Sequence, residues 1–182
     1  MTGVVRLTLV SHGMTDAMAD GRFPADEPLN ELGRRQVQAI TAQFGSTARY
    51  FVAPELRARQ TAGLLGCDGA AEPLLADLDC GRWRGRALQA VDEADLAAWL
   101  TDPAGAPHGG ESIADLTVRA SRWLNALTAN ALRTVAVTHP AVIRAAIAAA
   151  LDADPASFWR VDVAPAACVV MHHRGGRWTL RL

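Results

Sequence analysis

The sequence predicts an α/β fold, a three-layer α/β/α sandwich in which helices cover both faces of a mostly parallel sheet. Short β-rich apolar runs at 4–10, 49–53 and 134–138 are typical of buried strands. Segments with helical periodicity or helix-capping signals separate these runs, and such alternation favours parallel pairing. The length of 182 residues suits one domain, so residues 1–182 are predicted to form a single one.

Two helices are expected in the first half of the chain. Asn30 can cap a helix over 31–44, because its side chain can accept a hydrogen bond from a free N–H of the first turn. Pro54 lies where a helix reaching Leu65 would begin, a position that tolerates the missing N–H of proline. The remaining residues are expected to form loops and irregular segments at 20–24, 26–28, 66–73 and 74–85.

The second half is expected to hold four helices and a closing hairpin. The helices are predicted at 91–100, 111–131, 139–151 and 155–160, and the hairpin at 166–172 and 177–182 around a Gly-Gly turn. The helix at 111–131 has an apolar face made of Ile113, Leu116, Ala120, Trp123, Leu124 and Leu127.

Composition narrows the function classes. The net charge is −1, so no nucleic acid and no anionic membrane is expected as a partner. All 18 basic residues are arginine, which excludes lysine nucleophiles and Schiff bases. Cys67, Cys80 and Cys168 fit no metal or CxxC spacing, and their odd number favours a reducing compartment. With no signal-peptide pattern at the N-terminus, a cytoplasmic location is expected.

Three chemically capable side chains follow predicted strands. His12 comes directly after the first strand, Arg57 shortly after the second and His139 directly after the third. Ligands of open parallel sheets bind beyond the carboxyl ends of the strands. One such histidine would usually be structural, whereas three capable groups at equivalent positions predict a shared site.

The segments around these residues resemble the signatures of the histidine phosphatase superfamily, the phosphoglycerate-mutase-like group. The matches are LVSHGMT at 9–15, the Pro-Leu, Gly-Arg and Gln pattern of 28–36, APELRARQTA at 53–62, LADLDCGRWRG at 75–85, GGES at 109–112 and VTHPAVIR at 137–144. They occur in the order of the family and cover nearly the whole chain. The resemblance therefore implies a phosphoglycerate-mutase-like fold.

The resemblance also implies a set of catalytic residues. His12 would attack phosphorus and become phosphohistidine, and Gly13 would let the backbone approach the substrate. Arg57 and His139 would donate hydrogen bonds to the phosphoryl oxygens. Asp77, where the family usually has Glu, would protonate the leaving oxygen and then deprotonate water. This cycle needs no metal and no cofactor.

A wider group is implied at the substrate-binding pocket. It consists of Ser11, Gly13, Thr15, Arg22, Arg84 and Glu111. Glu111 is a secondary candidate, because a carboxylate in the first turn of a helix is also favoured by the helix dipole.

Four residues depart from the pattern of the family. Ser11 replaces an arginine, Met14 a Glu or Gln, Met18 an asparagine, and Pro140 a glycine whose N–H can bond phosphate. Losing one such donor commonly costs about 10²–10³ in rate. The pocket is therefore expected to be less electropositive than a standard phosphomonoesterase site, unless Arg22 or Arg84 turns toward it.

Two assignments stay open at this level. Asp79 rivals Asp77, because side chains two residues apart in an extended segment share a face. Arg59 lies close to Arg57 in sequence, although the position of Arg57 within the motif favours it.

The predicted function is phosphomonoester hydrolysis of a small organic phosphate through phosphohistidine at His12. A hydrolase is favoured over a mutase, because mutases of the family tend to be longer. One alternative is a repurposed or inactive relative that binds a ligand or partner, and another uses the histidines for acid–base chemistry on a different anion. The expected partner is a small anionic molecule, and a homodimer is an expected assembly because dimers are common among relatives.

Overall fold

The computed structural model describes residues 3–44 and 48–181, which form a central six-stranded sheet. Its strands are β1 (Val5–Ser11), β2 (Arg49–Val52), β3 (Ala70–Ala71), β4 (Arg133–Thr138), β5 (Cys168–Arg174) and β6 (Arg177–Arg181). The order across the sheet is β3-β2-β4-β1-β5-β6. The strands β3, β2, β4 and β1 pair with their neighbours in parallel. The strand β5 is antiparallel to β1, and β6 is antiparallel to β5. The predicted α/β fold with a mostly parallel sheet is confirmed.

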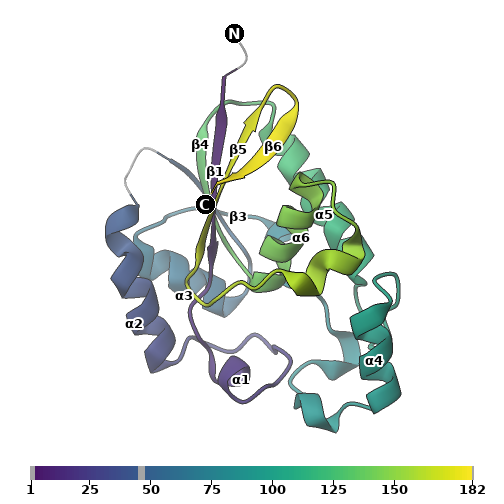
Figure 1. The fold of residues 1–182 in the computed structure, drawn as a ribbon. Coiled ribbons are helices and arrows are strands. Elements are labelled where there is room, and N and C mark those ends of the chain that lie inside the picture. Colours follow the sequence, from purple (N-terminus) through teal and green to yellow (C-terminus); the bar gives the residue numbers. More distant parts are fainter. Residues whose placement is uncertain (1–2, 45–47, 182) are drawn as a thin grey trace.

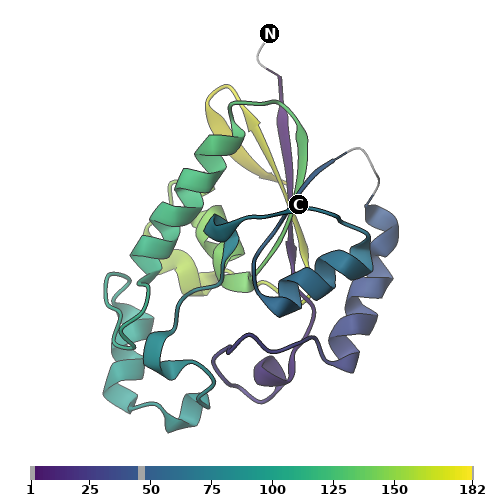
Figure 2. The ribbon, with the colours of Figure 1, turned by 180° about the vertical axis from the view of Figure 1, so that it is seen from behind.

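Helices form a layer on each face of this sheet. The helices α2 (Glu31–Ile40) and α3 (Leu56–Leu65) lie on one face, and α5 (Ile113–Leu127) and α6 (Pro140–Ala150) lie on the other (Figures 1 and 2). The predicted sandwich is thus present. The short 3₁₀ helices are η1 (Thr41–Gln43), η2 (Pro73–Leu75), η3 (Gly81–Trp83), η4 (Leu88–Ala90) and η5 (Pro155–Arg160).

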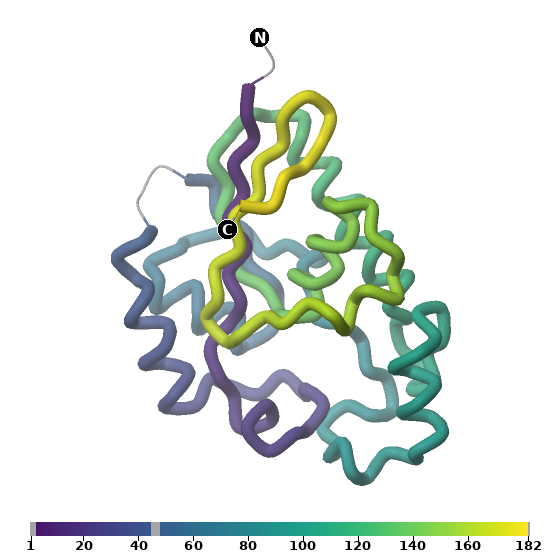
Figure 3. The backbone as a smooth tube through the Cα atoms, viewed as in Figure 1, coloured from purple at the N-terminus to yellow at the C-terminus, as the bar shows by residue number. Residues whose placement is uncertain are grey.

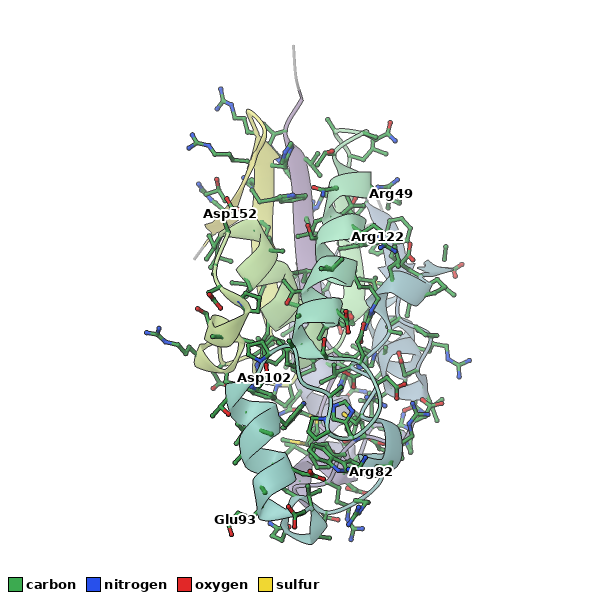
Figure 4. The ribbon with its side chains drawn as sticks, turned by 90° about the vertical axis from the view of Figure 1, so that its right-hand side faces the viewer. Arg49, Arg82, Glu93, Asp102, Arg122 and Asp152 are labelled. Atoms are coloured by element: carbon green, nitrogen blue, oxygen red, sulfur yellow. The ribbon has the colours of Figure 1, made fainter. Side chains whose placement is uncertain are left out.

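Two further helices lie beyond the carboxyl end of β1. They are α1 (Asp16–Ala19) and α4 (Glu93–Thr101), and the views from front and back both place them at the same end of the sheet (Figures 1 and 2). The chain from η5 to β5 also passes this end (Figure 3). Figure 4 shows Glu93 and Asp102 at opposite ends of α4. These segments surround the region to which the parallel strands point.

Side-chain caps explain where several helices begin. The Asn30 side chain accepts a hydrogen bond from Gly33 N at 2.9 Å, as the sequence predicts. Ser112 accepts one from Asp115 N at 3.0 Å, so α5 begins at Ile113 and not at the expected residue 111. Such caps each contribute about 0.5–2 kcal/mol.

The structure corrects two expectations about local structure. The segment 66–73, expected to be a turn, contains β3, whose two alanines carry no β pattern and form a strand because they pair with Phe51 and Val52. The helix expected at Pro54 begins at Leu56, since Glu55 is extended at φ −70° and ψ 149°. The closing hairpin is present, but its expected last residue, Leu182, lies outside the described residues.

The core is continuous with the strands that carry the site. Leu7, Leu9 and Val10 of β1 and Ala136 and Val137 of β4 are fully buried. Burying a large aliphatic side chain contributes roughly 1.5–3 kcal/mol. The two strands are therefore held rigidly, which fixes the residues at their ends.

The parallel register of β1 and β4 decides which residues meet. Ser11 pairs with Thr138, so the next residues, His12 and His139, lie side by side. The His12 N–H donates to Thr138 O at 3.0 Å. None of the helices in the described ranges is long and apolar enough to cross a bilayer.

Candidate active site

His12 and His139 face each other at the carboxyl ends of β1 and β4. Their ring centroids lie 5.1 Å apart at an interplanar angle of 64°. His12 is 2% exposed and His139 is 0% exposed. The convergence of strand ends predicted from the sequence is therefore present in the fold.

The His12 ring is held in one tautomer. Nδ1 lies 2.7 Å from Gly13 O, and a carbonyl can only accept, so Nδ1 carries the proton and Nε2 carries the lone pair. Burial, followed by the charges of His139 and Arg57, lowers the pKa of His12 from 6.5 to about 4. His12 is therefore a neutral imidazole at neutral pH, with Nε2 available as a nucleophile.

Arg57 enters the site from the first turn of α3. Its side chain is 2% exposed, and Nη2 donates to Asp77 Oδ2 at 2.6 Å. Within the described ranges, Nη1 has no hydrogen-bond partner, and Glu27 Oε1 lies 3.9 Å away. Buried donors are nearly always paired, so Nη1 is suited to an external acceptor such as an oxyanion.

Asp77 lies between the arginine and the second histidine. Its Oδ2, bonded to Arg57, is also 3.4 Å from His139 Nδ1, which has no hydrogen-bond partner within the described chain. Burial alone would raise the pKa of Asp77, but the charges of His139, Arg57 and His12 outweigh it and hold the pKa at about 2. The carboxylate therefore occupies a position that an anionic ligand would also favour.

The rival carboxylate, Asp79, points elsewhere. It accepts hydrogen bonds from Gly81 N at 3.0 Å and Arg84 Nη2 at 3.2 Å, and its side chain is 55% exposed. The structure thus brings Asp77, but not Asp79, into contact with Arg57 and His139.

Glu55, which is not predicted as a site residue from the sequence, links His139 and Asp77. Its Oε2 lies 2.7 Å from His139 Nε2, and its Oε1 accepts from Asp77 N at 3.0 Å. These bonds lower the pKa of Glu55 although burial opposes them. The N–H of Leu56 at the start of α3 is satisfied instead by Asp26 Oδ1 at 2.6 Å, which leaves the Glu55 side chain free for the site.

Glu111 has a structural contact outside the pocket. It forms a two-bond pair with Arg119, at 2.7 Å to both Nε and Nη2. Arg119 Nη1 also donates to Leu74 O and Ala76 O at 2.8 Å each. This clamp fixes the segment that ends in Asp77, and Glu111 is not among the residues that line the site.

A pocket opens from His12, Arg57 and Asp77 toward α1, α4 and η5. Besides these three it is lined by Ala17, Met18, Arg22, Phe23, Pro24, Glu27, Leu78, Cys80, Trp99, Pro140, Ala141, Arg144, Phe158 and Trp159. Arg22 thus lines it, as the sequence suggests. Arg144, the last residue of the matched segment 137–144, lines it too, although the sequence does not predict it as a site residue.

A second hollow on the other side of Asp77 is acidic. It is lined by Pro24, Asp26, Pro54, Glu55, Arg57, Ala76, Asp77, Leu78, Asp79 and Arg84. Arg84 therefore lies on this side, paired with Asp79, and not in the pocket that His12 lines.

Three predicted pocket residues, Ser11, Gly13 and Thr15, form their hydrogen bonds with other groups of the protein. The Ser11 hydroxyl is fully buried and lies 3.4 Å from His12 O. Thr15 caps α1 through Met18 N and donates to Glu27 at 3.2 Å. None of the three is among the lining residues of the pocket.

The expected reason for Gly13 changes in the structure. A Cβ on Gly13 would lie 2.5 Å from Gly33 O, so the close approach that requires a glycine here is to the backbone of α2. The Gly13 N–H donates to Thr61 Oγ1 at 3.2 Å, so this donor is already used.

The departures from the family pattern divide into two groups. Met18 and Pro140 line the pocket and give it carbon surface, whereas Met14 N donates to Gln36 and Met14 lies outside the lining. In the described part of the chain, no three His, Cys, Asp or Glu side chains are grouped to hold a metal ion.

Comparisons with known proteins identify the family of the chain. Residues 7–182 match the model of the histidine phosphatase superfamily (branch 1). The chain is 30% identical over 172 residues to a protein of Mycobacterium tuberculosis (strain ATCC 25618 / H37Rv) that is named as bifunctional, with 87% of this chain and 47% of that protein covered. The chain thus spans about half the length of that relative.

A second relative is covered more fully. The chain is 30% identical over 178 residues to the glucosyl-3-phosphoglycerate phosphatase of Mycolicibacterium vanbaalenii, covering 87% of this chain and 79% of the relative. Among solved structures, a mycobacterial glucosyl-3-phosphoglycerate phosphatase in complex with VO3 superimposes with a TM-score of 0.86 at 27% identity, over 98% of each chain. The neighbours share the phosphoglycerate-mutase-like fold, and the chain belongs to the histidine phosphatase superfamily, branch 1.

Proposed function

We propose that this protein hydrolyses small phosphate monoesters through a phosphohistidine at His12. One observation carries the proposal: two buried nitrogen atoms, Arg57 Nη1 and His139 Nδ1, lack hydrogen-bond partners in the described chain, beside a neutral imidazole. A phosphoryl group can accept hydrogen bonds from Arg57 Nη1, and from His139 Nδ1 when that ring carries both protons, while its phosphorus faces His12. The proposal is also supported by relatives whose names state a phosphatase activity.

The first step transfers the phosphoryl group to the protein. The Nε2 lone pair of His12 forms a bond to phosphorus, and the bond from phosphorus to the ester oxygen breaks. Arg57 and His139 stabilise the charge that collects on the phosphoryl oxygens. A protonated Asp77 gives its proton to the departing oxygen, which leaves as an alcohol.

Asp77 must gain a proton for this step. In the free protein Arg57 and His139 hold its pKa at about 2, so the carboxylate is ionised at neutral pH. A phosphate that contacts Arg57 and His139 competes with the carboxylate for both side chains and adds a like charge beside it. Both effects raise the pKa of Asp77, so substrate binding itself favours the acid form.

The second step reverses these roles. Asp77, now a carboxylate, removes a proton from water, and the water oxygen attacks phosphorus. The bond from phosphorus to Nε2 breaks, the electron pair returns to His12, and inorganic phosphate leaves. The proton is again on Asp77, as in the substrate complex, and Asp77 releases it to solvent when phosphate leaves and its low pKa is restored.

The phosphate end has fewer donors than the family pattern, because Ser11 replaces an arginine and Pro140 a glycine. Two other arginines in the pocket restore part of the positive potential. Arg22 and Arg144 both line the pocket that His12 opens into. Arg144 is held in place because its Nε donates to Val161 O at 2.8 Å. The two side chains add positive potential to the approach of an anionic substrate.

The same proposal extends to surroundings and assembly. A cytoplasmic location is supported by three cysteines that are all free, two of them buried. Small phosphorylated molecules are the proposed substrates. A homodimer is the proposed assembly, and sedimentation equilibrium would test it.

Turnover of 4-nitrophenyl phosphate from pH 4 to 8 tests the activity. We expect wild-type turnover, and a loss of at least about 10³-fold in kcat for His12→Ala, because the variant lacks the attacking nitrogen and burial raises the pKa of the Cys80 thiol in the lining to about 12. His172→Ala on β5 is the control, since that residue pairs with Arg6 near the amino end of β1, away from His12. Absence of wild-type turnover, or equal turnover by His12→Ala, would overturn the proposal.

A further inference from the structure

The pocket beyond the catalytic residues has a wall made of aromatic rings. Trp99 and Trp159 lie with their centroids 4.5 Å apart, and Phe158 lies 4.8 Å from Trp159. Phe23 lies 5.5 Å from Trp99 on the other side. These edge-to-face contacts make a rigid surface, because each ring is fixed by its neighbours.

The rest of the outer pocket is also carbon. Met18 and Pro140, two of the residues that depart from the family pattern, line it together with Ala17 and Ala141. Met18 and Trp159 are both half-buried, so each keeps surface that a ligand can cover. The substitutions that remove polar groups from the phosphate end thus add apolar area beside it.

Neutral hydrogen-bond donors are few in this wall, and the indole N–H groups belong to Trp99 and Trp159. The lining contains no serine, threonine, asparagine or glutamine side chain within the described ranges. Both oxygens of Glu27 are already engaged, by Thr15 Oγ1 at 3.2 Å and Ala25 N at 2.8 Å. Several sugar hydroxyls placed here would lose more hydrogen bonds to water than these few donors could replace.

The arginine at this wall braces the rings. The Arg144 guanidinium carbon lies 5.8 Å from the ring centroids of both Phe158 and Trp159, and Nε is bonded to Val161 O. The wall is therefore preformed, and a flat apolar group could bind to it without ordering loose side chains.

Resting on the proposed function, we infer that the protein is specific for phosphate monoesters of alcohols that carry an aromatic or similarly bulky apolar group. The phosphoryl group would lie at His12, Arg57 and Asp77. The apolar group would cover Trp159, Trp99 and Met18. Monoesters of polyhydroxylated alcohols would be poor substrates, because the same surface would strip water from their hydroxyls.

Two monoesters of primary alcohols test this specificity. In 2-phenylethyl phosphate and 2-hydroxyethyl phosphate the departing alcohols are both primary, so the comparison reports on the pocket. We expect kcat/KM to favour the phenyl compound by at least about 30-fold, since even one methylene in an apolar pocket is worth roughly 10–200-fold. Equal values for the two compounds would overturn the inference.

Variants then locate the preference. Trp159→Ala should lower kcat/KM for the phenyl ester at least about tenfold and change the hydroxyethyl ester by less than about threefold. Trp178→Ala, a partly buried tryptophan on β6 that packs on His173, is the matched control and should change neither value. Equal losses for both esters in Trp159→Ala would contradict an apolar subsite. If that variant fails to fold, Met18→Gln carries the same expectation.

A binding measurement separates this inference from the proposed activity. Phosphonates with a stable P–C bond, 3-phenylpropylphosphonate and 3-hydroxypropylphosphonate, bind without turnover and can be compared by calorimetry. Tighter binding of the phenyl compound, lost in Trp159→Ala, supports the subsite even if no ester is hydrolysed, in which case only the proposed activity fails. Equal affinities, or no binding of either compound, would overturn the subsite even if hydrolysis is found.

Discussion

The carboxylate of Asp77 lies beside both side chains that a phosphate would contact, Arg57 and His139. It lies 2.6 Å from Arg57 Nη2 and 3.4 Å from His139 Nδ1. A ligand oxygen must therefore displace or protonate this carboxylate. Asp77 is expected to favour the chemical step and to oppose the binding of anions to the free protein.

Asp77→Asn should separate these two effects. We expect kcat to fall by about 10²–10⁴-fold, because the general acid is lost. The dissociation constant of orthovanadate should decrease, because a competing charge is removed from Arg57. Asp79→Asn is the control and should alter neither quantity, since that side chain is exposed. Weaker vanadate binding by Asp77→Asn would contradict this account of the carboxylate.

Glu55 is expected to act through the residues it positions. Glu55→Gln keeps an acceptor for Asp77 N but places an amide beside His139 Nε2. We expect kcat to fall by about 10–100-fold, the range typical of residues that orient a functional side chain, with little change in KM. Glu93→Gln, an exposed residue of α4, is the control (Figure 4). An unchanged kcat, or a loss confined to KM, would show that Glu55 has no such role.

The sequence predicts a site residue when its position follows from the adjacent residues of the chain. His12 and His139 could be predicted because each directly follows a buried strand. Glu55 could not, because its contact with His139 spans 84 positions and depends on how the segments after β2 and β4 meet. Arg144 was missed for a similar reason, since its periodic position in a helix says nothing about the pocket next to that helix.

At the scale of elements, β1 and α2 are joined by close backbone packing. A Cβ on Gly33 would lie 2.1 Å from Met14 O and 2.6 Å from Met14 N. This contact holds the loop after His12 against α2. The glycine pattern of the family is explained here by packing between elements, which a motif comparison alone does not reveal.

Gly33→Ala should therefore destabilise the protein. We expect a loss of at least about 1–3 kcal/mol in the free energy of unfolding, the usual cost of overpacking, measured by urea denaturation. Gly63→Ala is a matched control inside α3, where nothing lies within 4 Å of the added Cβ. It should stabilise by roughly 0.5–1 kcal/mol, because alanine favours a helix. A neutral effect of Gly33→Ala would refute the close packing of these elements.

The shortest strand marks what pattern reading cannot detect. Two alanines, Ala70 and Ala71, form β3 only because an exposed edge of β2 is available to pair with them. The strands β1 and β4 were predictable because burial on both faces demands continuous apolar runs. Buried strands can therefore be predicted from the sequence, whereas a strand that forms only by pairing with a neighbour cannot.

At the scale of the whole molecule, the buried site couples stability to pH. The pKa of His12 is about 4 in the folded protein against 6.5 as its ordinary value. Between these values the unfolded chain binds more protons, so the free energy of unfolding falls as pH decreases from 6.5 to 4. Asp77, with a pKa of about 2 against 3.8, extends the loss at lower pH, because its folded form resists protonation.

Urea denaturation across pH 4 to 7 tests this coupling. We expect wild type to lose roughly 3 kcal/mol over this range from His12, since one pKa unit corresponds to about 1.4 kcal/mol. His12→Gln, which has no titrating ring, should lose less stability over the same range. Parallel curves for the two proteins would show that His12 is not buried as a neutral ring.

The central claim is that Nε2 of His12 receives the phosphoryl group, and trapping that intermediate tests it most directly. Wild type and Asp77→Asn would be mixed with 4-nitrophenyl phosphate, quenched in alkali and analysed by peptide mass spectrometry. The account predicts one added phosphoryl group on the peptide containing His12, more abundant in Asp77→Asn because hydrolysis of the intermediate is slowed, and absent from His12→Ala. Phosphate release by wild type with no label on His12 in either protein, or a label on another residue, would contradict it.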